Sequence, residues 1–117
     1  MSIPEGYGTE VLKRVFSNNL SDTVVDILPG EADHIYTVLT VSFTERASST
    51  TELINMSIYS GSTDITLLAS QPIGSLQTFT WNDKFVMVGT DILRVSAVTS
   101  ASFDVWVSYI DQNWDES

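Results

Sequence analysis

Apolar and polar residues alternate with a period of two along most of this chain, and no stretch of a dozen residues keeps the spacing of a helix. Successive side chains of a β-strand point to opposite faces, so this alternation is typical of strands that bury one face. The sequence therefore predicts an all-β fold. In residues 34–43, strict alternation separates one face, Tyr36, Val38, Thr40 and Ser42, from the other, Ile35, Thr37, Leu39, Val41 and Phe43. In residues 103–110 it separates Phe103, Val105, Val107 and Tyr109 from Asp104, Trp106, Ser108 and Ile110.

Turn-forming residues divide the alternating pattern into nine predicted strands. The predicted strands cover residues 10–16, 23–28, 34–43, 53–59, 63–69, 77–81, 84–88, 92–98 and 103–110. The gaps carry turn residues, such as Ser60-Gly61-Ser62 and Gly89-Thr90-Asp91. Asn82-Asp83 is interpreted as a two-residue hairpin loop, because Asn and Asp tolerate the positive φ of such turns.

Eight or nine short antiparallel strands can bury their apolar faces in a two-sheet sandwich. We predict a jelly-roll-like sandwich, with an immunoglobulin-like sandwich and a closed barrel as alternatives; the cysteine pair of true immunoglobulin domains is absent. A chain of 117 residues suits one core, so residues 1–117 are predicted to form one domain. Within it we expect a flexible N-terminal arm (1–9), the sandwich (10–110) and an acidic, flexible C-terminal tail (111–117).

The chain is strongly acidic, with 15 Asp and Glu against 5 Lys and Arg and a formal net charge of −10. Such a surface repels nucleic-acid phosphates and anionic lipid headgroups, and no apolar run approaches the roughly 20 residues of a spanning helix. We expect neither a nucleic-acid nor a membrane partner. Residues 1–5 have neither the basic start nor the apolar run of a signal peptide, so none is expected.

The sequence favours a non-enzymatic protein. No cysteine is present, which excludes disulfides, thiolate catalysis and cysteine-ligated zinc. His34 is the only histidine, no Gly-x-Ser-x-Gly elbow accompanies it, and we expect it to hydrogen-bond locally beside a turn. Most acidic residues fall in turns, and no calcium-binding loop pattern occurs. We therefore predict no catalytic residue, no metal site and no cofactor.

Aromatic residues are the candidates for binding. Tyr36, Trp81 and Trp106 lie on predicted strands, where such side chains cover a core or, when exposed, stack on sugars or anchor an interface. Trp114 lies in the polar tail, and docking onto a neighbouring subunit would explain it. Together with Ile3, Pro4 and Tyr7 of the N-terminal arm it forms the predicted set of partner contacts, in a dimer or trimer.

Three segments carry a resemblance to a known group of proteins. They are Trp81-Asn82-Asp83-Lys84-Phe85-Val86-Met87, then Gly89-Thr90-Asp91-Ile92-Leu93-Arg94-Val95-Ser96-Ala97, and finally Val105-Trp106-Val107-Ser108-Tyr109-Ile110. With the earlier strands from Ile35 they resemble the small β-sandwich virion proteins of tailed bacteriophages, in which a hairpin with Trp, Lys and a Gly-Asp turn precedes the last strand. Here Thr90 separates the Gly from the Asp.

The resemblance implies a structural part of a phage particle, made in the host cytoplasm, whose partners are the major capsid protein or other virion proteins. A head decoration (cement) protein is favoured within that class, with a neck, tail or fibre-attachment protein second. A carbohydrate- or receptor-binding module remains an alternative, because jelly rolls bind sugars and three Trp and four Tyr are available.

Overall fold

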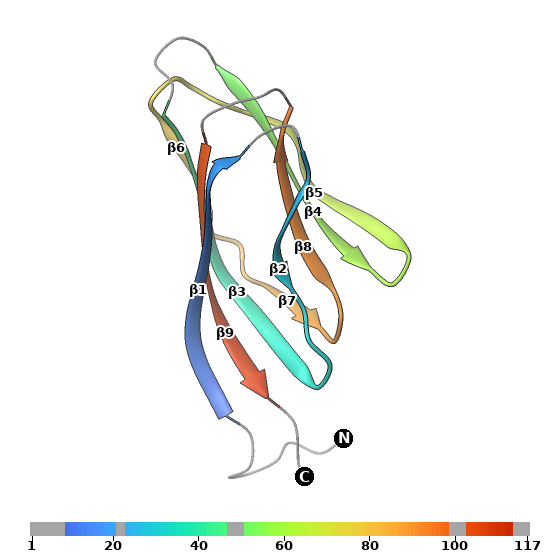
Figure 1. The fold of residues 1–117 in the computed structure, drawn as a ribbon. Helices are drawn as coiled ribbons and strands as arrows, with labels where there is room; N and C mark the ends of the chain where they lie inside the picture. Colours follow the sequence, from blue (N-terminus) through green and yellow to red (C-terminus); the bar gives the residue numbers. More distant parts are fainter. Residues whose placement is uncertain (1–8, 21–22, 47–50, 99–102, 114–117) are drawn as a thin grey trace.

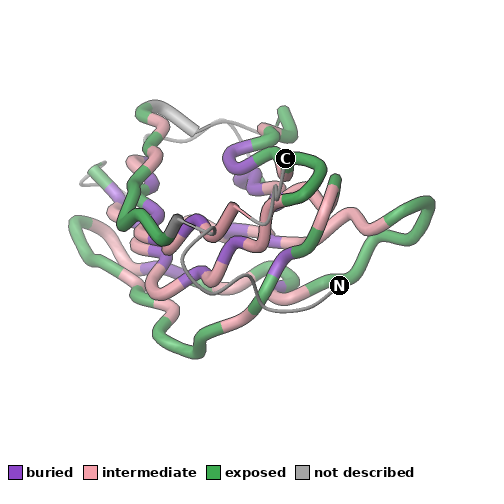
Figure 2. Tube along the Cα trace, turned by 90° about the horizontal axis from the view of Figure 1, so that it is seen from below, coloured by how far each residue is buried: buried purple, intermediate pink, exposed green. Residues whose placement is uncertain are grey.

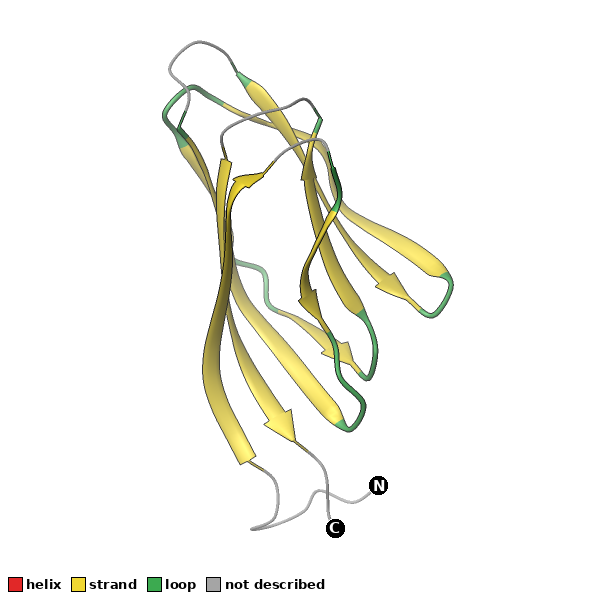
Figure 3. Ribbon diagram, in the orientation of Figure 1, coloured by secondary structure: helices red, strands yellow, loops and turns green. Residues whose placement is uncertain are grey.

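The computed structural model describes residues 9–20, 23–46, 51–98 and 103–113, and these residues form an all-β fold with no helix that could span a membrane (Figure 3). The nine strands are β1 (Thr9–Leu20), β2 (Val25–Pro29), β3 (His34–Glu45), β4 (Glu52–Ser60), β5 (Thr63–Ile73), β6 (Thr78–Trp81), β7 (Phe85–Val88), β8 (Ile92–Ala97) and β9 (Phe103–Asn113). Each corresponds to one predicted strand.

The strands form two antiparallel sheets that face each other (Figure 1). Sheet A has the order β1-β9-β3, with β6 and β7 both on the free edge of β3; sheet B has the order β2-β8-β4-β5. The pairs are nested, because β4 pairs with β5, β3 with β6 and β7, β2 with β8, and β1 with β9. Wrapping a long antiparallel hairpin over itself produces this nesting, which is the jelly roll. The predicted jelly-roll-like sandwich is confirmed.

The core lies between the sheets, and in the view along the sandwich the buried stretches gather in the interior (Figure 2). The predicted division of β9 into two faces is confirmed, and the inward face is that of Phe103, Val105, Val107 and Tyr109, which are all buried. From the other strands the core takes mainly Val41, Phe43, Ile54, Met56, Met87, Leu93, Val95 and Ala97. Removal of this apolar surface from water, at about 25 cal/mol per Å², is the main force that holds the two sheets together.

The predicted faces of β3 are wrong for its first half. Below Leu39 the buried residues are Tyr36 and Val38, whereas above it they are Val41 and Phe43. The cause is a β-bulge: Val38 pairs with Tyr109 and Thr40 with Ser108, so Leu39 is an extra residue. One inserted residue reverses the inward and outward parity of the strand.

The predicted hairpin at Asn82-Asp83 is also wrong. β6 pairs with Thr44–Val41 of β3 and β7 with Val38–Ile35, so the two short strands follow one another along the same edge of β3. Between them the Trp81 indole Nε1 donates a hydrogen bond to the Asp83 carbonyl oxygen at 2.7 Å. The segment from Trp81 to Ala97 is likewise not a hairpin, because β7 belongs to sheet A and β8 to sheet B.

β9 extends further than predicted. It continues to Asn113, so residues 111–113 belong to the sheet and not to the tail, and Asp111 is only 4% exposed. The strand continues because β1 and β3 both pair with it, at Thr9 and His34 respectively. The pairs Thr9–Asn113 and Leu20–Phe103 mark the two ends of sheet A, which we call the Thr9–Asn113 end and the Leu20–Phe103 end.

The turn Gly89-Thr90-Asp91 makes hydrogen bonds to the ends of several strands. Gly89 has φ of 57°, which suits glycine. The Asp91 carboxylate accepts hydrogen bonds from the Val88 backbone N–H (3.1 Å) and the Ser60 hydroxyl (2.7 Å). The Gly30 N–H donates to the Asp91 carbonyl at 2.7 Å, and a Cβ on Gly30 would lie 2.3 Å from the Gly89 oxygen.

The tight contact at Gly30 predicts that substitutions at Gly30 and Gly61 differ in their effect on stability. Gly30→Ala forces backbone against backbone and should lower the free energy of unfolding in urea by about 2–3 kcal/mol. Gly61→Asn is the control, since Gly61 has φ of 64° but open space around it, and Asn tolerates that conformation. It should change stability by no more than about 0.5 kcal/mol. Equal effects of the two substitutions would show that the Gly30 contact is not tight.

Candidate docking surface

The outer faces of the two sheets differ in chemistry. On the outer face of sheet B, the Arg94 Nε lies 3.0 Å from an Asp26 carboxylate oxygen, and its guanidinium lies 4.3 Å from the centre of the Tyr59 ring. These polar groups satisfy one another. Exposed apolar residues of sheet B, such as Ile65 in its edge strand β5, lie near the edge of the sheet. On sheet A, by contrast, exposed and half-buried apolar side chains lie side by side on four strands.

Five side chains form this surface, which we call the apolar face: Leu12, Ile35, Val86, Val88 and Ile110. Leu12 of β1 pairs with Ile110 of β9, Ile110 with Thr37 of β3, and Thr37 with Val86 of β7, so one row crosses four strands. In the next row Ile35 pairs with Val88. Leu12 is 72% exposed and Val86 57%. A contiguous exposed patch of this kind marks an interaction site more often than scattered apolar residues do.

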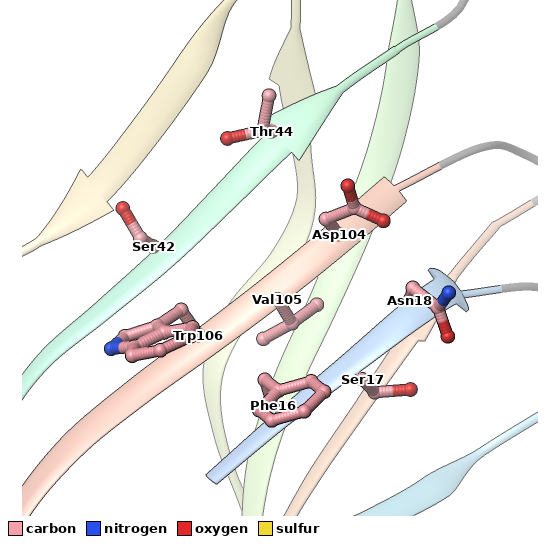
Figure 4. Close-up of a pocket in the computed structure, with 8 residues that line it drawn as sticks. All are labelled: Phe16, Ser17, Asn18, Ser42, Thr44, Asp104, Val105 and Trp106. Carbon is pink, nitrogen blue, oxygen red and sulfur yellow. The ribbon is translucent and has the colours of Figure 1, made fainter. Parts of the chain in front are cut away.

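A depression lies nearer the Leu20–Phe103 end of the same sheet (Figure 4). Its volume is about 370 Å³, and it is lined by Phe16, Ser17, Asn18, Ser42, Thr44, Asp104, Val105 and Trp106. Phe16 and Trp106 are cross-strand partners whose rings stack, with centroids 5.6 Å apart and planes 13° from parallel. The depression opens where the register of β1 shifts against β9, between Ser17 and Leu20.

A cluster of charged residues lies at the Thr9–Asn113 end, on the inward side of sheet A. The buried Asp111 carboxylate accepts from the Lys13 ammonium at 2.8 Å through one oxygen and lies 2.7 Å from His34 Nδ1 through the other. His34 Nε2 lies 3.2 Å from a Glu31 carboxylate oxygen. The rings of Tyr36 and Tyr109, with centroids 5.1 Å apart, lie nearby in the same sheet.

These contacts shift the pKa values of the cluster. Burial raises the pKa of Asp111, but the hydrogen bonds from Lys13 and His34 outweigh it and hold the pKa below its ordinary value of 3.8. The hydrogen bond to Asp111 raises the pKa of Lys13. Burial raises the pKa of both Tyr36 and Tyr109. The cluster is a charge-assisted anchor that joins β1, β3 and β9.

The sequence-predicted contacts have different outcomes. Ile3, Pro4, Tyr7 and Trp114 lie outside the described residues, and their role in partner contacts stays a prediction. Trp106 is 46% exposed on sheet A.

The other aromatic candidates are covered: Tyr36 is buried in the core, and Trp81 packs against it. His34 bonds to Asp111, 77 residues away, besides its contact with the nearby Glu31. Both ring nitrogens thus face carboxylates, which leaves neither to activate a serine.

The sequence alone does not predict the apolar face, because its residues become neighbours only through the order of the strands in the sheet. For Val86 and Val88 the sequence does contain a usable pattern, since these two residues alternate with the buried Met87. In the part of the chain that the structure describes, no group of three or more His, Cys, Asp or Glu residues is placed to hold a metal ion.

Comparisons with known proteins agree with this architecture. The sequence matches no family model, and no curated protein matches it. The fold is similar to a chain in the acidic stable capsid structure of Helicobacter pylori bacteriophage KHP30, with a TM-score of 0.59 and 7% identity over 92% of this chain and 94% of that chain. It is also similar to a chain of infectious bursal disease virus, Gx strain, with a TM-score of 0.51 and 8% identity over 90% of this chain but only 31% of the viral one. At these identities the likeness establishes a shared jelly-roll fold.

The Asp111 contacts predict a specific pH dependence of stability. The pKa of Asp111 is lower in the folded chain than in the unfolded one, so its contribution is present above pH 3.8 and is lost as the pH falls through the folded pKa. At pH 6, Asp111→Asn should lower the free energy of unfolding by about 1–3 kcal/mol. The difference in the free energy of unfolding between this variant and the unmodified chain should become smaller on acidification to about pH 3.

Asp26→Asn is the matched control, because it removes an ion pair in which the Asp26 side chain is half exposed. Such a pair contributes about 0–1 kcal/mol. Urea unfolding of both variants over this pH range provides the test. A loss for Asp111→Asn that stays constant with pH would show that its carboxylate is not held ionised by Lys13 and His34.

Proposed function

We propose that this chain is a non-enzymatic virion structural protein of a phage, attached to the head as a decoration (cement) protein. The observation that carries the proposal is the apolar face, which crosses four strands of sheet A toward the Thr9–Asn113 end and leaves Leu12, Val86 and Val88 exposed. A partner surface that removes it from water would provide a favourable free energy of binding.

The comparison with the phage KHP30 structure supports this role. There the match covers 94% of the other chain, so a sandwich of this size accounts for nearly all of one chain in a capsid structure. In the bursal disease virus the similar part is about a third of a larger chain. A sandwich of this size therefore occurs both as nearly a whole chain and as one part of a larger chain in capsid structures.

The arms extend the proposed contact. β1 begins and β9 ends near the apolar face, since Thr9 pairs with Asn113 and, three residues further along β1, Leu12 pairs with Ile110. Residues 1–8 and 114–117 continue from these two strand ends, so Ile3, Pro4, Tyr7 and Trp114 are proposed to contact the shell or a sister subunit in a dimer or trimer. The net charge of −10 favours a partner surface that is neutral or basic.

The direct test measures binding to undecorated shells assembled from the major capsid protein of the same genome. Leu12→Glu combined with Val86→Glu should weaken co-sedimentation at least about 100-fold, because two apolar contacts are lost and two charges are buried. Ile65→Glu is the control, since Ile65 is also exposed (51%) but lies in sheet B. It should bind like the unmodified chain.

Two results would contradict the proposal: no binding of the unmodified chain to shells, or equal binding of the double variant and the control.

The alternative of a neck, tail or fibre-attachment protein is tested in the same experiment by adding purified tails and portal assemblies. Binding to those, and not to shells, would favour the alternative.

A second prediction concerns the arms. Removal of residues 1–8 leaves β1 intact from Thr9, so the chain should still fold with an unchanged unfolding midpoint. Shell binding should fall about tenfold or more, and Trp114→Ala should reduce it or shift the oligomer equilibrium measured by sedimentation. Unchanged shell occupancy and unchanged self-association in both variants would show that the arms make no contact with the shell or with a sister subunit.

A further inference from the structure

The depression on sheet A has a chemistry that the apolar face lacks. Its wall contains two stacked aromatic rings, Phe16 and Trp106, and its rim contains hydroxyl, amide and carboxylate groups from Ser42, Thr44 and Asp104 together with Ser17 and Asn18 (Figure 4). Apolar ring surface beside several short polar side chains is suited to a ligand with an apolar ring face and hydroxyl groups at its edge.

The carboxylate of Asp104 provides a second observation. Its Oδ2 lies 3.1 Å from Arg46 Nε, whereas its Oδ1 is screened from water and finds no hydrogen-bond donor among the described residues. The screened Oδ1 leaves Oδ2 as the oxygen that faces the depression's rim. The Asp104 side chain is nevertheless 44% exposed, so a ligand hydroxyl would donate to Oδ2, beside Arg46.

The aromatic pair is also held in place from one side. Arg14 lies one row further toward the Thr9–Asn113 end, opposite Ser108, and its guanidinium carbon is 5.5 Å from the Phe16 ring centre and 5.1 Å from that of Trp106. Asp104 and Thr44 lie one row away on the opposite side of Trp106. The rings therefore have a cation on one side and the polar depression on the other.

We infer that this depression is a binding site for a neutral carbohydrate ring, stacked against Trp106 and hydrogen-bonded by Asp104. The volume of about 370 Å³ lies near the lower end of the range for small-molecule sites, about 300–1,000 Å³, and suits one or two sugar rings. Asp104 and the net charge of −10 disfavour acidic sugars. Phe16 lies four residues further along β1 than Leu12, about 13 Å away, so the site lies nearer the other end of the sheet than the apolar face does.

The test is an NMR titration of the full chain with methyl glycosides of glucose, galactose, mannose and N-acetylglucosamine, and with sialic acid as the acidic probe. The chain has three tryptophans and therefore three indole N–H signals, of which Trp106 is assigned with the variant Trp106→Phe. At least one neutral glycoside should shift the Trp106 signal, with a Kd of about 1 mM expected for so open a site.

Two variants and one control define the site. Measured by the backbone amide signals of the strands around the depression, Trp106→Ala and Asp104→Asn should each weaken binding at least about tenfold, while Tyr59→Ala, an aromatic change on the outer face of sheet B, should leave it unchanged. Both altered side chains are on the outer face, and an unchanged urea midpoint verifies folding; should Trp106→Ala not fold, Asp104→Asn decides the test alone.

Three results would overturn the inference: no shift with any neutral glycoside, binding that survives both substitutions, or stronger binding of sialic acid. Loss of shell binding in Trp106→Ala would also overturn it, because the depression would then belong to the docking surface. The sugar titration and the shell-binding test give independent results, because Leu12→Glu with Val86→Glu should weaken shell binding and leave the sugar response unchanged.

Discussion

The β-bulge at Leu39 determines what each face of sheet A presents. Because of this one extra residue, Tyr36 and Val38 join Val41 and Phe43 in the core. Without it, Ile35 would point inward and Tyr36 outward. The same parity places His34 on the inward side, where it reaches Asp111. The apolar face and the charged cluster thus both depend on one register shift in the central strand of the sheet.

The nested strand pairing explains how the surface regions are arranged. It brings the first and last described strands together along their whole length, from Thr9–Asn113 to Leu20–Phe103. The strand ends that lead to the two arms therefore lie at one end of sheet A, beside the apolar face. The depression lies nearer the other end, where β1 loses register with β9. An elongated sandwich, 53 Å in its longest dimension, can hold a partner at one end and a ligand toward the other.

Local patterns were enough to predict the strands but not their partners. Alternation identified nine strands and separated the two faces of β9, because each depends only on neighbouring residues. Asn82-Asp83 carries genuine turn chemistry, yet it interrupts an edge strand, because β3 offers pairing partners on both sides of it. Residues 111–117 have the acidic composition of an exposed tail, so the sequence did not predict that Asp111 is buried. Its partner Lys13 is 98 residues away. The five residues of the apolar face come from four strands, so no linear pattern could have assembled them.

Attachment through the apolar face can be measured by side-chain footprinting of the free and the shell-bound chain. Hydroxyl-radical labelling should fall at Leu12, Val86 and Val88 on binding, and remain unchanged at Ile65 in sheet B and at Trp106 beside the depression. Protection of Ile65, with Leu12 and Val86 labelled as in the free chain, would contradict it.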